Sequence, residues 1–253
     1  MDQEPQPSGI SQAGIILLIA AFLAMLLHQA FHVTMGWLLS PEEYGELGVA
    51  MATMPILGFL LQFGFPQTVA RFIASNGEQA PGIFKKGLLA NSGIGILLAI
   101  VIYLVATFFL PLEQSYQRII PLLAISPVIM AIGFVFRYAL QGTFRFAQMG
   151  IVDVFQIAVA LILASILVIA GLGTYGAVIG VISGQVCILI LALIFLRGTN
   201  LLTRGNWDSP AIYNFAGSML LGNLAITLIL NVDILGVKFL AGPSQLNDIT
   251  GYY

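Results

Sequence analysis

The sequence predicts an all-α polytopic membrane protein with about seven transmembrane helices. Of the 253 residues, 59% are hydrophobic and 8% are charged, whereas roughly 25% of the residues in a soluble domain are charged. The apolar residues form long uninterrupted blocks, and a helix needs about 20 of them to cross the roughly 30 Å hydrocarbon layer. Membrane β-strands would instead alternate over about ten residues. The composition thus argues against a soluble enzyme, and a net charge of −2 provides no basic surface for nucleic acid.

Breaks at charges, prolines and glycine clusters separate seven candidate spans. The spans cover residues 11–39, 49–70, 87–110, 119–139, 151–171, 175–196 and 212–240. A short tail at 1–10 precedes the first span. Because this tail contains acidic residues but no Lys or Arg, it differs from the start of a cleavable signal peptide. We therefore expect the first span to remain as a helix.

Proline and glycine inside the spans predict bends and close packing. Pro55 lies in the second span, and Pro121 and Pro127 lie in the fourth, where each removes a backbone donor and favours a kink. Broken helices are common in transporters, yet single prolines are frequent in membrane helices of any kind, so both interpretations stay open. Small residues recur every four positions in the sixth span, at Gly176, Gly180 and Gly184. This stripe predicts that a neighbouring helix approaches closely.

The distribution of Lys and Arg between the loops predicts the orientation of the helices. Seven basic residues fall on the side of the loops after spans two, four and six: Arg71, Lys85, Lys86, Arg137, Arg145, Arg197 and Arg204. The opposite side receives Arg118 and Lys238. We therefore expect a protein of the cytoplasmic membrane with its N-terminus and its even-numbered loops in the cytoplasm. The first outer loop, at 40–48, is correspondingly acidic.

The ends of the first and seventh spans resemble each other. Residues 36–41 (GWLLSP) are followed by Tyr44 and Gly45, and residues 236–243 (GVKFLAGP) are followed by Gly251 and Tyr252. Six spans separate the two segments, so both leave from the same side of the membrane. This similarity predicts two parallel six-helix repeats.

The repeat divides the chain into a six-helix lobe at 11–205 and the start of a second lobe at 206–253. Since the sequence stops at Tyr253, one helix into the second lobe, we expect a truncated gene, a split protein or a partial sequence. A genuine seven-helix protein is the alternative.

Four segments resemble a known family: 38–45 (LLSPEEYG), 63–74 (FGFPQTVARFIA), 141–146 (QGTFRF) and 231–236 (NVDILG). Together they resemble the polysaccharide-unit flippases of the multidrug/oligosaccharidyl-lipid/polysaccharide (MOP) exporter superfamily. The resemblance implies two six-helix lobes around a central cavity. It also implies movement of lipid-linked oligosaccharides across the cytoplasmic membrane, with this chain providing the first lobe and the first helix of the second.

Three arginines near the cytoplasmic ends of the spans are candidates for substrate binding: Arg71, Arg137 and Arg145. A guanidinium group matches phosphate oxygens in a bidentate manner, so these side chains are suited to the diphosphate of a polyprenyl-linked sugar. The alternative is that they only follow the positive-inside rule.

Ionisable groups deeper in the spans are candidates for ion coupling. His28 and His32 lie four residues apart on one face of the first span, and imidazole changes its charge near neutral pH. Asp233 is an acidic residue inside the seventh span, at about the level of His32 when the two repeats are aligned. Two alternatives remain for the histidines, as metal ligands without an evident third partner or as helix-packing residues. We expect Asp153, at the start of the fifth span, to interact with the helix dipole.

The leading interpretation is a flippase for polyprenyl-diphosphate-linked oligosaccharides that works by alternating access and is coupled to an ion. Its expected partners are membrane lipid and lipid-linked sugar, together with a second-half lobe or glycosyltransferase machinery. A multidrug or cation exporter is the near alternative, and a membrane-embedded enzyme and a non-transporting accessory subunit are the others. We expect no metal and no cofactor. The G-x-G-x-x-G pattern at 171–176 does not indicate a nucleotide site, because it lies between two membrane helices rather than in a βαβ unit.

Overall fold

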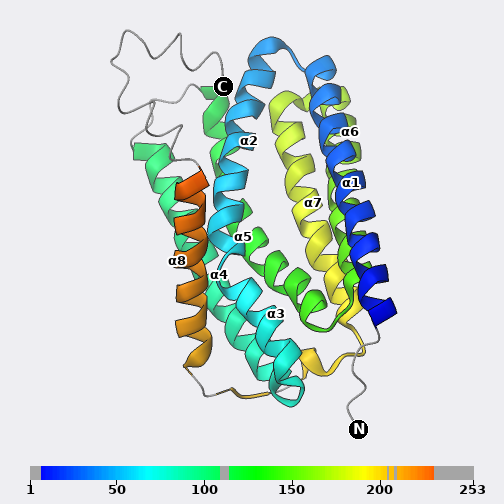
Figure 1. The fold of residues 1–253 in the computed structure, drawn as a ribbon. Coiled ribbons are helices and arrows are strands. Elements are labelled where there is room, and N and C mark those ends of the chain that lie inside the picture. Colours follow the sequence, from blue (N-terminus) through cyan, green and yellow to red (C-terminus); the bar gives the residue numbers. More distant parts are fainter. Residues whose placement is uncertain (1–6, 109–113, 204, 208–209, 231–253) are drawn as a thin grey trace.

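The computed structural model describes residues 7–108, 114–203, 205–207 and 210–230. These residues form helices that run alternately up and down the bundle, and none of them lies in a strand (Figure 1). The α-helices are α1 (Pro7–Leu38), α2 (Pro41–Gln62), α3 (Phe65–Ser75), α4 (Ala80–Phe108), α5 (Gln114–Gly142), α6 (Phe146–Leu167), α7 (Gly173–Leu196) and α8 (Ala211–Leu230). The short elements are the 3-10 turns η1 (Gly77–Gln79) and η3 (Asn200–Leu202) and the π-helical turn η2 (Val168–Leu172).

The described helices have the length and apolar composition of membrane spans. Five continuous stretches qualify by these two criteria: Ala13–Leu38, Pro41–Ser75, Gly77–Phe108, Ile119–Gly142 and Phe146–Leu196. The last is 51 residues long and contains both α6 and α7, which are separated by η2 and by Gly171 with φ 89°. Large apolar side chains are exposed along α1, with Leu18 at 71% and Phe22 at 59%, as expected where lipid replaces water. The prediction of a polytopic helical membrane protein is confirmed.

The second predicted span has different ends in the structure. The residues assigned to an outer loop at 40–48 belong to α2, which begins directly after Ser40. Ser40 and Glu43 form a capping box, because the amide of Glu43 donates to Ser40 Oγ and the amide of Ser40 donates to Glu43 Oε2. The spacing Ser-x-x-Glu is a sequence signal for such a helix start.

The helix of this span is interrupted after the proline rather than at it. Pro55 lies inside α2 without interrupting it, and the helix ends at Gln62. Phe63 and Gly64 leave the helical conformation, and α3 begins at the next residue with Pro66 in its first turn. A proline is tolerated there because the first amides of a helix have no intrahelical partner. Because of this break, eleven residues form a separate helix, α3, at the end of the bundle where α1 begins (Figure 1).

The glycine stripe of the sixth span packs as predicted. A Cβ atom added to Gly180 would lie 2.5 Å from Cα of Ala164, and one added to Gly184 would lie 2.5 Å from the carbonyl oxygen of Gln156. Since carbon atoms in contact are about 3.5–4.0 Å apart, only glycine fits at these positions. The stripe therefore brings α7 directly against α6, which also packs against α1 on its other side.

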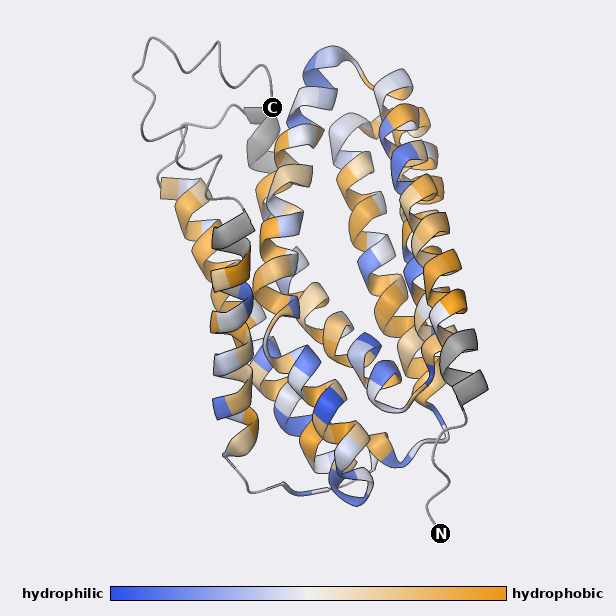
Figure 2. Ribbon diagram, in the orientation of Figure 1, coloured by the Kyte–Doolittle hydropathy of each residue, from blue (hydrophilic) through white to orange (hydrophobic). Residues whose placement is uncertain are grey.

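Hydrophilic segments concentrate around α3 and the turns at the N-terminal end of the bundle, whereas apolar residues cover most of the helix lengths (Figure 2). The α5–α6 turn, the start of α4 and the end of α7 share this end with α3 (Figure 1). Basic residues of these elements are Arg71, Lys85, Lys86, Arg145 and Arg197. They lie at one end, as the orientation prediction requires, while the assignment of that end to the cytoplasm stays a prediction.

The seventh predicted span corresponds to α8 as far as the structure describes it. α8 packs on α3 through aromatic rings, with Phe65 and Tyr213 centroids 5.7 Å apart and Phe72 and Phe215 centroids 5.8 Å apart. Residues 231–240, the repeat turn that follows and Asp233 lie outside the described residues. The division into lobes at residue 206 remains a prediction.

Candidate functional site

The structure brings together two of the four segments that carry the family resemblance. Segment 63–74 forms the break after α2 and nearly all of α3, and segment 141–146 forms the end of α5 and the turn that leads into α6. The two segments touch at Gly142, where an added Cβ atom would lie 2.7 Å from the carbonyl oxygen of Ala70. Phe144 adopts a positive φ of 57° in the turn. About 70 residues of sequence separate segments that are neighbours in the fold.

A pocket of about 400 Å³ lies where these two segments meet. Its lining residues are Gln67, Ala70, Arg71 and Ala74 of α3, Tyr138 and Gln141 of α5, Phe144 and Phe146 at the turn, and Met219 of α8. This volume is in the range of small-molecule sites. Among these described residues Arg71 is the charged one and none is acidic. We call this site the Arg71 pocket.

Arg71 lies in α3 with an exposed side chain. Its guanidinium carbon is 4.5 Å from the ring centroid of Phe215 in α8, a cation–π contact that leaves the N–H groups at the edge of the guanidinium plane free to bind other groups. No carboxylate of the described residues forms an ion pair with Arg71. Arg71 is thus suited to bind an anion that enters the pocket.

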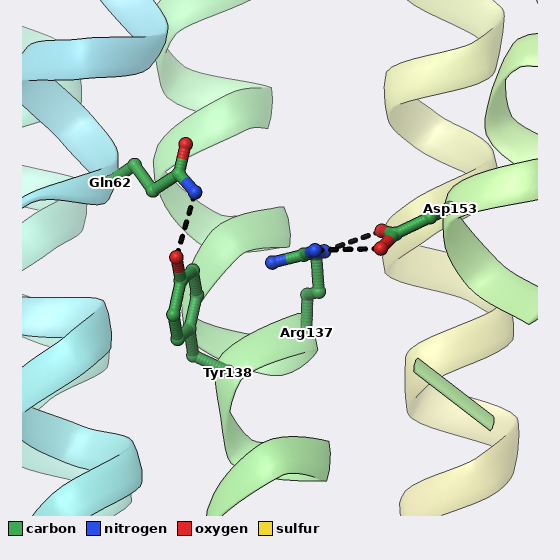
Figure 3. Close-up of polar contacts among 4 residues, drawn as sticks. All are labelled: Gln62, Arg137, Tyr138 and Asp153. Carbon is green, nitrogen blue, oxygen red and sulfur yellow. Dashed lines mark hydrogen bonds and ion pairs between the residues drawn. The ribbon is translucent and has the colours of Figure 1, made fainter. Parts of the chain in front are cut away.

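Arg137 lies deeper in the bundle and already has a partner. Its Nε donates to Oδ1 of Asp153 at 2.5 Å and its Nη2 donates to Oδ2 at 2.6 Å, which forms a bidentate ion pair between α5 and α6 (Figure 3). The two side chains are 16% and 25% exposed. Asp153 is therefore not a helix-start residue as expected, because α6 begins at Phe146, seven residues earlier.

A polar row connects this ion pair to the Arg71 pocket. Nε2 of Gln62 in α2 donates to the Tyr138 hydroxyl at 2.7 Å, and the Tyr138 ring centroid is 5.2 Å from the guanidinium carbon of Arg137. Figure 3 shows the four side chains in sequence from α2 across α5 to α6. Because Tyr138 also lines the pocket, it forms the boundary between the pocket and the ion pair.

Arg145 stabilises the turn. It is the residue before α6, and its Nη1 donates to the carbonyl oxygen of Phe195 near the end of α7. Its side chain is half-buried and does not line the Arg71 pocket. Of the three candidate arginines, the structure therefore places one in the pocket, one in an ion pair beside the pocket and one between two helix ends.

The two histidines lie on α1, far along the chain from the arginines. His28 is exposed and His32 is half-buried, and their ring centroids are 5.5 Å apart. Both line a second pocket of about 490 Å³ between α1 and α2, together with Tyr44 and Met51. The third residue proposed for ion coupling, Asp233, lies outside the described residues. In the described part of the chain no three His, Cys, Asp or Glu residues are close enough to hold a metal ion.

A buried polar group in the middle of the bundle escaped the sequence analysis. The Ser126 hydroxyl donates to Oε1 of Gln185 at 2.9 Å, which links α5 to α7, and both residues are buried. Nδ2 of Asn91 donates to the carbonyl oxygen of Ala131 at 2.8 Å and links α4 to α5. Single polar residues inside long apolar blocks were the signal, since such residues often hydrogen bond between membrane helices.

Solved transporter structures have a fold similar to that of this chain. A MOP superfamily transporter from Pyrococcus furiosus has a TM-score of 0.69 and 17% identity, and the match covers 88% of this chain and 54% of that one. A MATE protein in complex with Br-NRF has a TM-score of 0.70, 17% identity and coverages of 88% and 55%. An outward-facing multidrug resistance MATE family transporter of the MOP superfamily has a TM-score of 0.70, 18% identity and coverages of 88% and 54%.

The chain thus spans about half the length of these structures and has the fold of a MOP superfamily membrane transporter. The profile of the family described as "Polysaccharide biosynthesis protein" matches residues 10–253. The chain belongs to this family, which confirms the resemblance found in the sequence. None of the curated proteins compared with the chain matches it. The protein is a multi-pass membrane protein of this family.

Proposed function

We propose that this protein forms part of a flippase that moves polyprenyl-diphosphate-linked oligosaccharide units across the cytoplasmic membrane. The observation that carries the proposal is the Arg71 pocket, which has one cationic side chain and no acidic side chain among its described lining residues. Membership of a polysaccharide biosynthesis family and the fold of MOP superfamily transporters support it. Alternating access by one lobe rocking against another is the expected mechanism for such a fold.

The chemistry of the pocket fits the junction between a diphosphate and a sugar. The Arg71 guanidinium provides paired donors for phosphate oxygens. Gln67 and Gln141 provide amide groups, and Tyr138 provides a hydroxyl, all of which can bind sugar hydroxyls. Phe144 and Phe146 contribute apolar walls with ring centroids 6.1 Å apart. We propose that the diphosphate binds at Arg71 and that the first sugar extends along the glutamines.

The position of the pocket fits entry from the cytoplasm. The pocket is lined by α3 and the α5–α6 turn, which lie at the end of the bundle where α1 begins (Figure 1). We propose that this end faces the cytoplasm, as the positive-inside rule predicts. Arg71 then lies close to the level of phosphate headgroups, where a lipid-linked substrate carries its own diphosphate.

The same charge pattern disfavours the alternative substrates. The positive charge of Arg71 repels a cationic drug, and Asp153, the acidic residue in the polar row, is already paired with Arg137. For these reasons the flippase is preferred to a multidrug exporter.

Ion coupling is the second part of the proposal. We propose that His28 and His32, which share a pocket and lie in edge-to-face contact, bind a proton during the transport cycle together with Asp233. Two imidazoles at this separation repel each other when both are charged, so the proposal is one proton shared by the pair. The contribution of the seventh predicted span to this proposal depends on Asp233, which lies outside the described residues.

Binding of a lipid-linked sugar to the purified protein tests the proposed site. The probe is a short-chain polyprenyl-diphosphate-linked monosaccharide, and the readout is its dissociation constant in detergent micelles. Arg71→Ala removes a charge-assisted contact of about 1.5–3 kcal/mol, which corresponds to roughly 10-fold to 150-fold weaker binding. Lys85→Ala is the matched control, because Lys85 is an exposed cation at the same end outside the pocket. Equal loss in both variants, or no loss in either, would contradict the proposal.

A further inference from the structure

The Arg137–Asp153 ion pair lies inside the bundle, and the proposed pocket does not explain this position. Arg137 lies five residues before the end of α5 and Asp153 seven residues after the start of α6, so the pair is roughly 8–10 Å inside the bundle at 1.5 Å per residue. Charged groups at this depth are costly and mark functional positions more often than structural ones.

The guanidinium of Arg137 is shared between the carboxylate and the polar row. Asp153 accepts hydrogen bonds from Nε and Nη2 of Arg137, and the remaining guanidinium nitrogen points from the ion pair toward Tyr138 (Figure 3). Tyr138 lines the Arg71 pocket on its other side. An anion that advances from Arg71 past Tyr138 would therefore meet Arg137, whose positive charge is neutralised by Asp153.

We propose that Asp153 is an internal counter-ion that the anionic group of the substrate replaces on Arg137, and that Asp153 takes up one proton in this exchange. The inference rests on the proposed function, because the replacing anion is the substrate's diphosphate. Only hydrogen bonds change: the carboxylate releases two N–H donors and becomes a neutral carboxyl, and the guanidinium keeps its charge and binds phosphate oxygens. A proton is required because an unpaired carboxylate at low dielectric is strongly disfavoured.

The net charge of the site explains why binding of the anion and protonation of Asp153 are linked. Arg71, Arg137 and Asp153 together carry one positive charge, and a diphosphate diester that contacts both arginines adds two negative charges, so the site would have a net charge of −1. Protonation of Asp153 restores neutrality. Release of the anion then allows Asp153 to lose its proton and to bind Arg137 again, so that the substrate and the proton travel through the same cycle.

The helices packed against α6 supply few groups that could take up this proton instead. Among the described residues, the helices packed against α6 provide these ionisable side chains: Arg137 and Tyr138 of α5, His28 and His32 of α1, and Tyr175 and Cys187 of α7. Arg145 and Arg197 lie at the helix ends. Gly150 packs against Ala20 of α1, and α1 and α6 run in the same direction. His28 is therefore about five residues, or roughly 8 Å, further along the bundle than Asp153.

Proton uptake on substrate binding tests the inference. The probe is the short-chain polyprenyl-diphosphate-linked monosaccharide, whose diphosphate is a diester with a fixed charge near neutral pH. Calorimetry in two buffers of different ionisation enthalpy counts the protons taken up by the wild-type protein. We expect about one proton per bound molecule and binding that strengthens up to about tenfold for each unit of decrease in pH. This measurement needs no variant.

Asp153→Asn supplies the matching variant, because its side chain has nearly the shape of a protonated Asp153. We expect binding without proton uptake and without the pH slope, whereas the control Glu46→Gln, at the outer end of α2, keeps both. Wild-type binding without proton uptake, or an unchanged pH slope in Asp153→Asn, would overturn the inference and leave the proposed function intact. No binding by the wild-type protein at any pH would overturn both.

Discussion

The Arg137–Asp153 ion pair predicts a strong energetic coupling between α5 and α6. Arg137→Gln leaves Asp153 without its counter-charge at a position where its side chain is 25% exposed, and Asp153→Asn leaves Arg137 without its counter-charge at 16% exposure. Removing one partner of a buried pair costs about 3–5 kcal/mol, because the remaining group is desolvated and no longer compensated. With this partial exposure we expect each single variant to lose about 3 kcal/mol of unfolding free energy.

The double variant Arg137→Gln with Asp153→Asn removes both charges. Its two amide side chains can still form a neutral hydrogen bond worth about 1 kcal/mol. We therefore expect the double variant to be at least as stable as either single variant, which corresponds to a coupling energy of about 3 kcal/mol or more.

Equilibrium unfolding of the four proteins in mixed detergent micelles measures this cycle. The assay reports the unfolding free energy of the wild type, the two single variants and the double variant at one pH. If the effects of the single variants add within about 0.5 kcal/mol, the two charges do not stabilise each other, and both the ion pair and the exchange built on it would be contradicted.

Three further predictions concern packing, helix capping and coupling. Gly180→Ala should lower the unfolding free energy by about 1–3 kcal/mol relative to Gly93→Ala, whose added Cβ meets nothing within 4 Å; equal stabilities would contradict the α6–α7 contact. Ser40→Ala should cost about 0.5–2 kcal/mol through loss of the capping box, measured by thermal unfolding, and an unchanged midpoint would argue against that cap. His28→Asn combined with His32→Asn should abolish the response of transport to a pH gradient in vesicles, and flux that still follows the gradient would exclude the pair.

Most of the fold could be predicted because hydrophobic blocks report directly on membrane spans. Six of the seven predicted spans coincide with described helices, and α8 begins where the seventh was placed. The errors were at the ends. A polar helix start such as the one at Ser40 reads as a loop when only hydropathy is considered, and the separate helix α3 has a polar end that resembles a loop.

The candidate site was only partly predictable. Arg71 could be named from its position at a span end, but its pocket depends on segment 141–146, which only the tertiary structure brings against α3. The pairing of Asp153 was missed because the predicted span began at residue 151, five residues after the observed start of α6. An acidic residue in the first turn interacts with the helix dipole, whereas two turns further on it needs a partner, and Arg137 provides it.

Movement of a lipid-linked sugar in reconstituted vesicles tests the proposed function most directly. The vesicles contain a labelled polyprenyl-diphosphate sugar and the protein, alone or together with a complete second six-helix lobe. We predict faster movement of the label across the bilayer than in protein-free vesicles in at least one of these preparations, and a reduction of that movement by Arg71→Ala but not by Lys85→Ala. Equal movement in protein-containing and protein-free vesicles, with and without the second lobe, would contradict the flippase proposal.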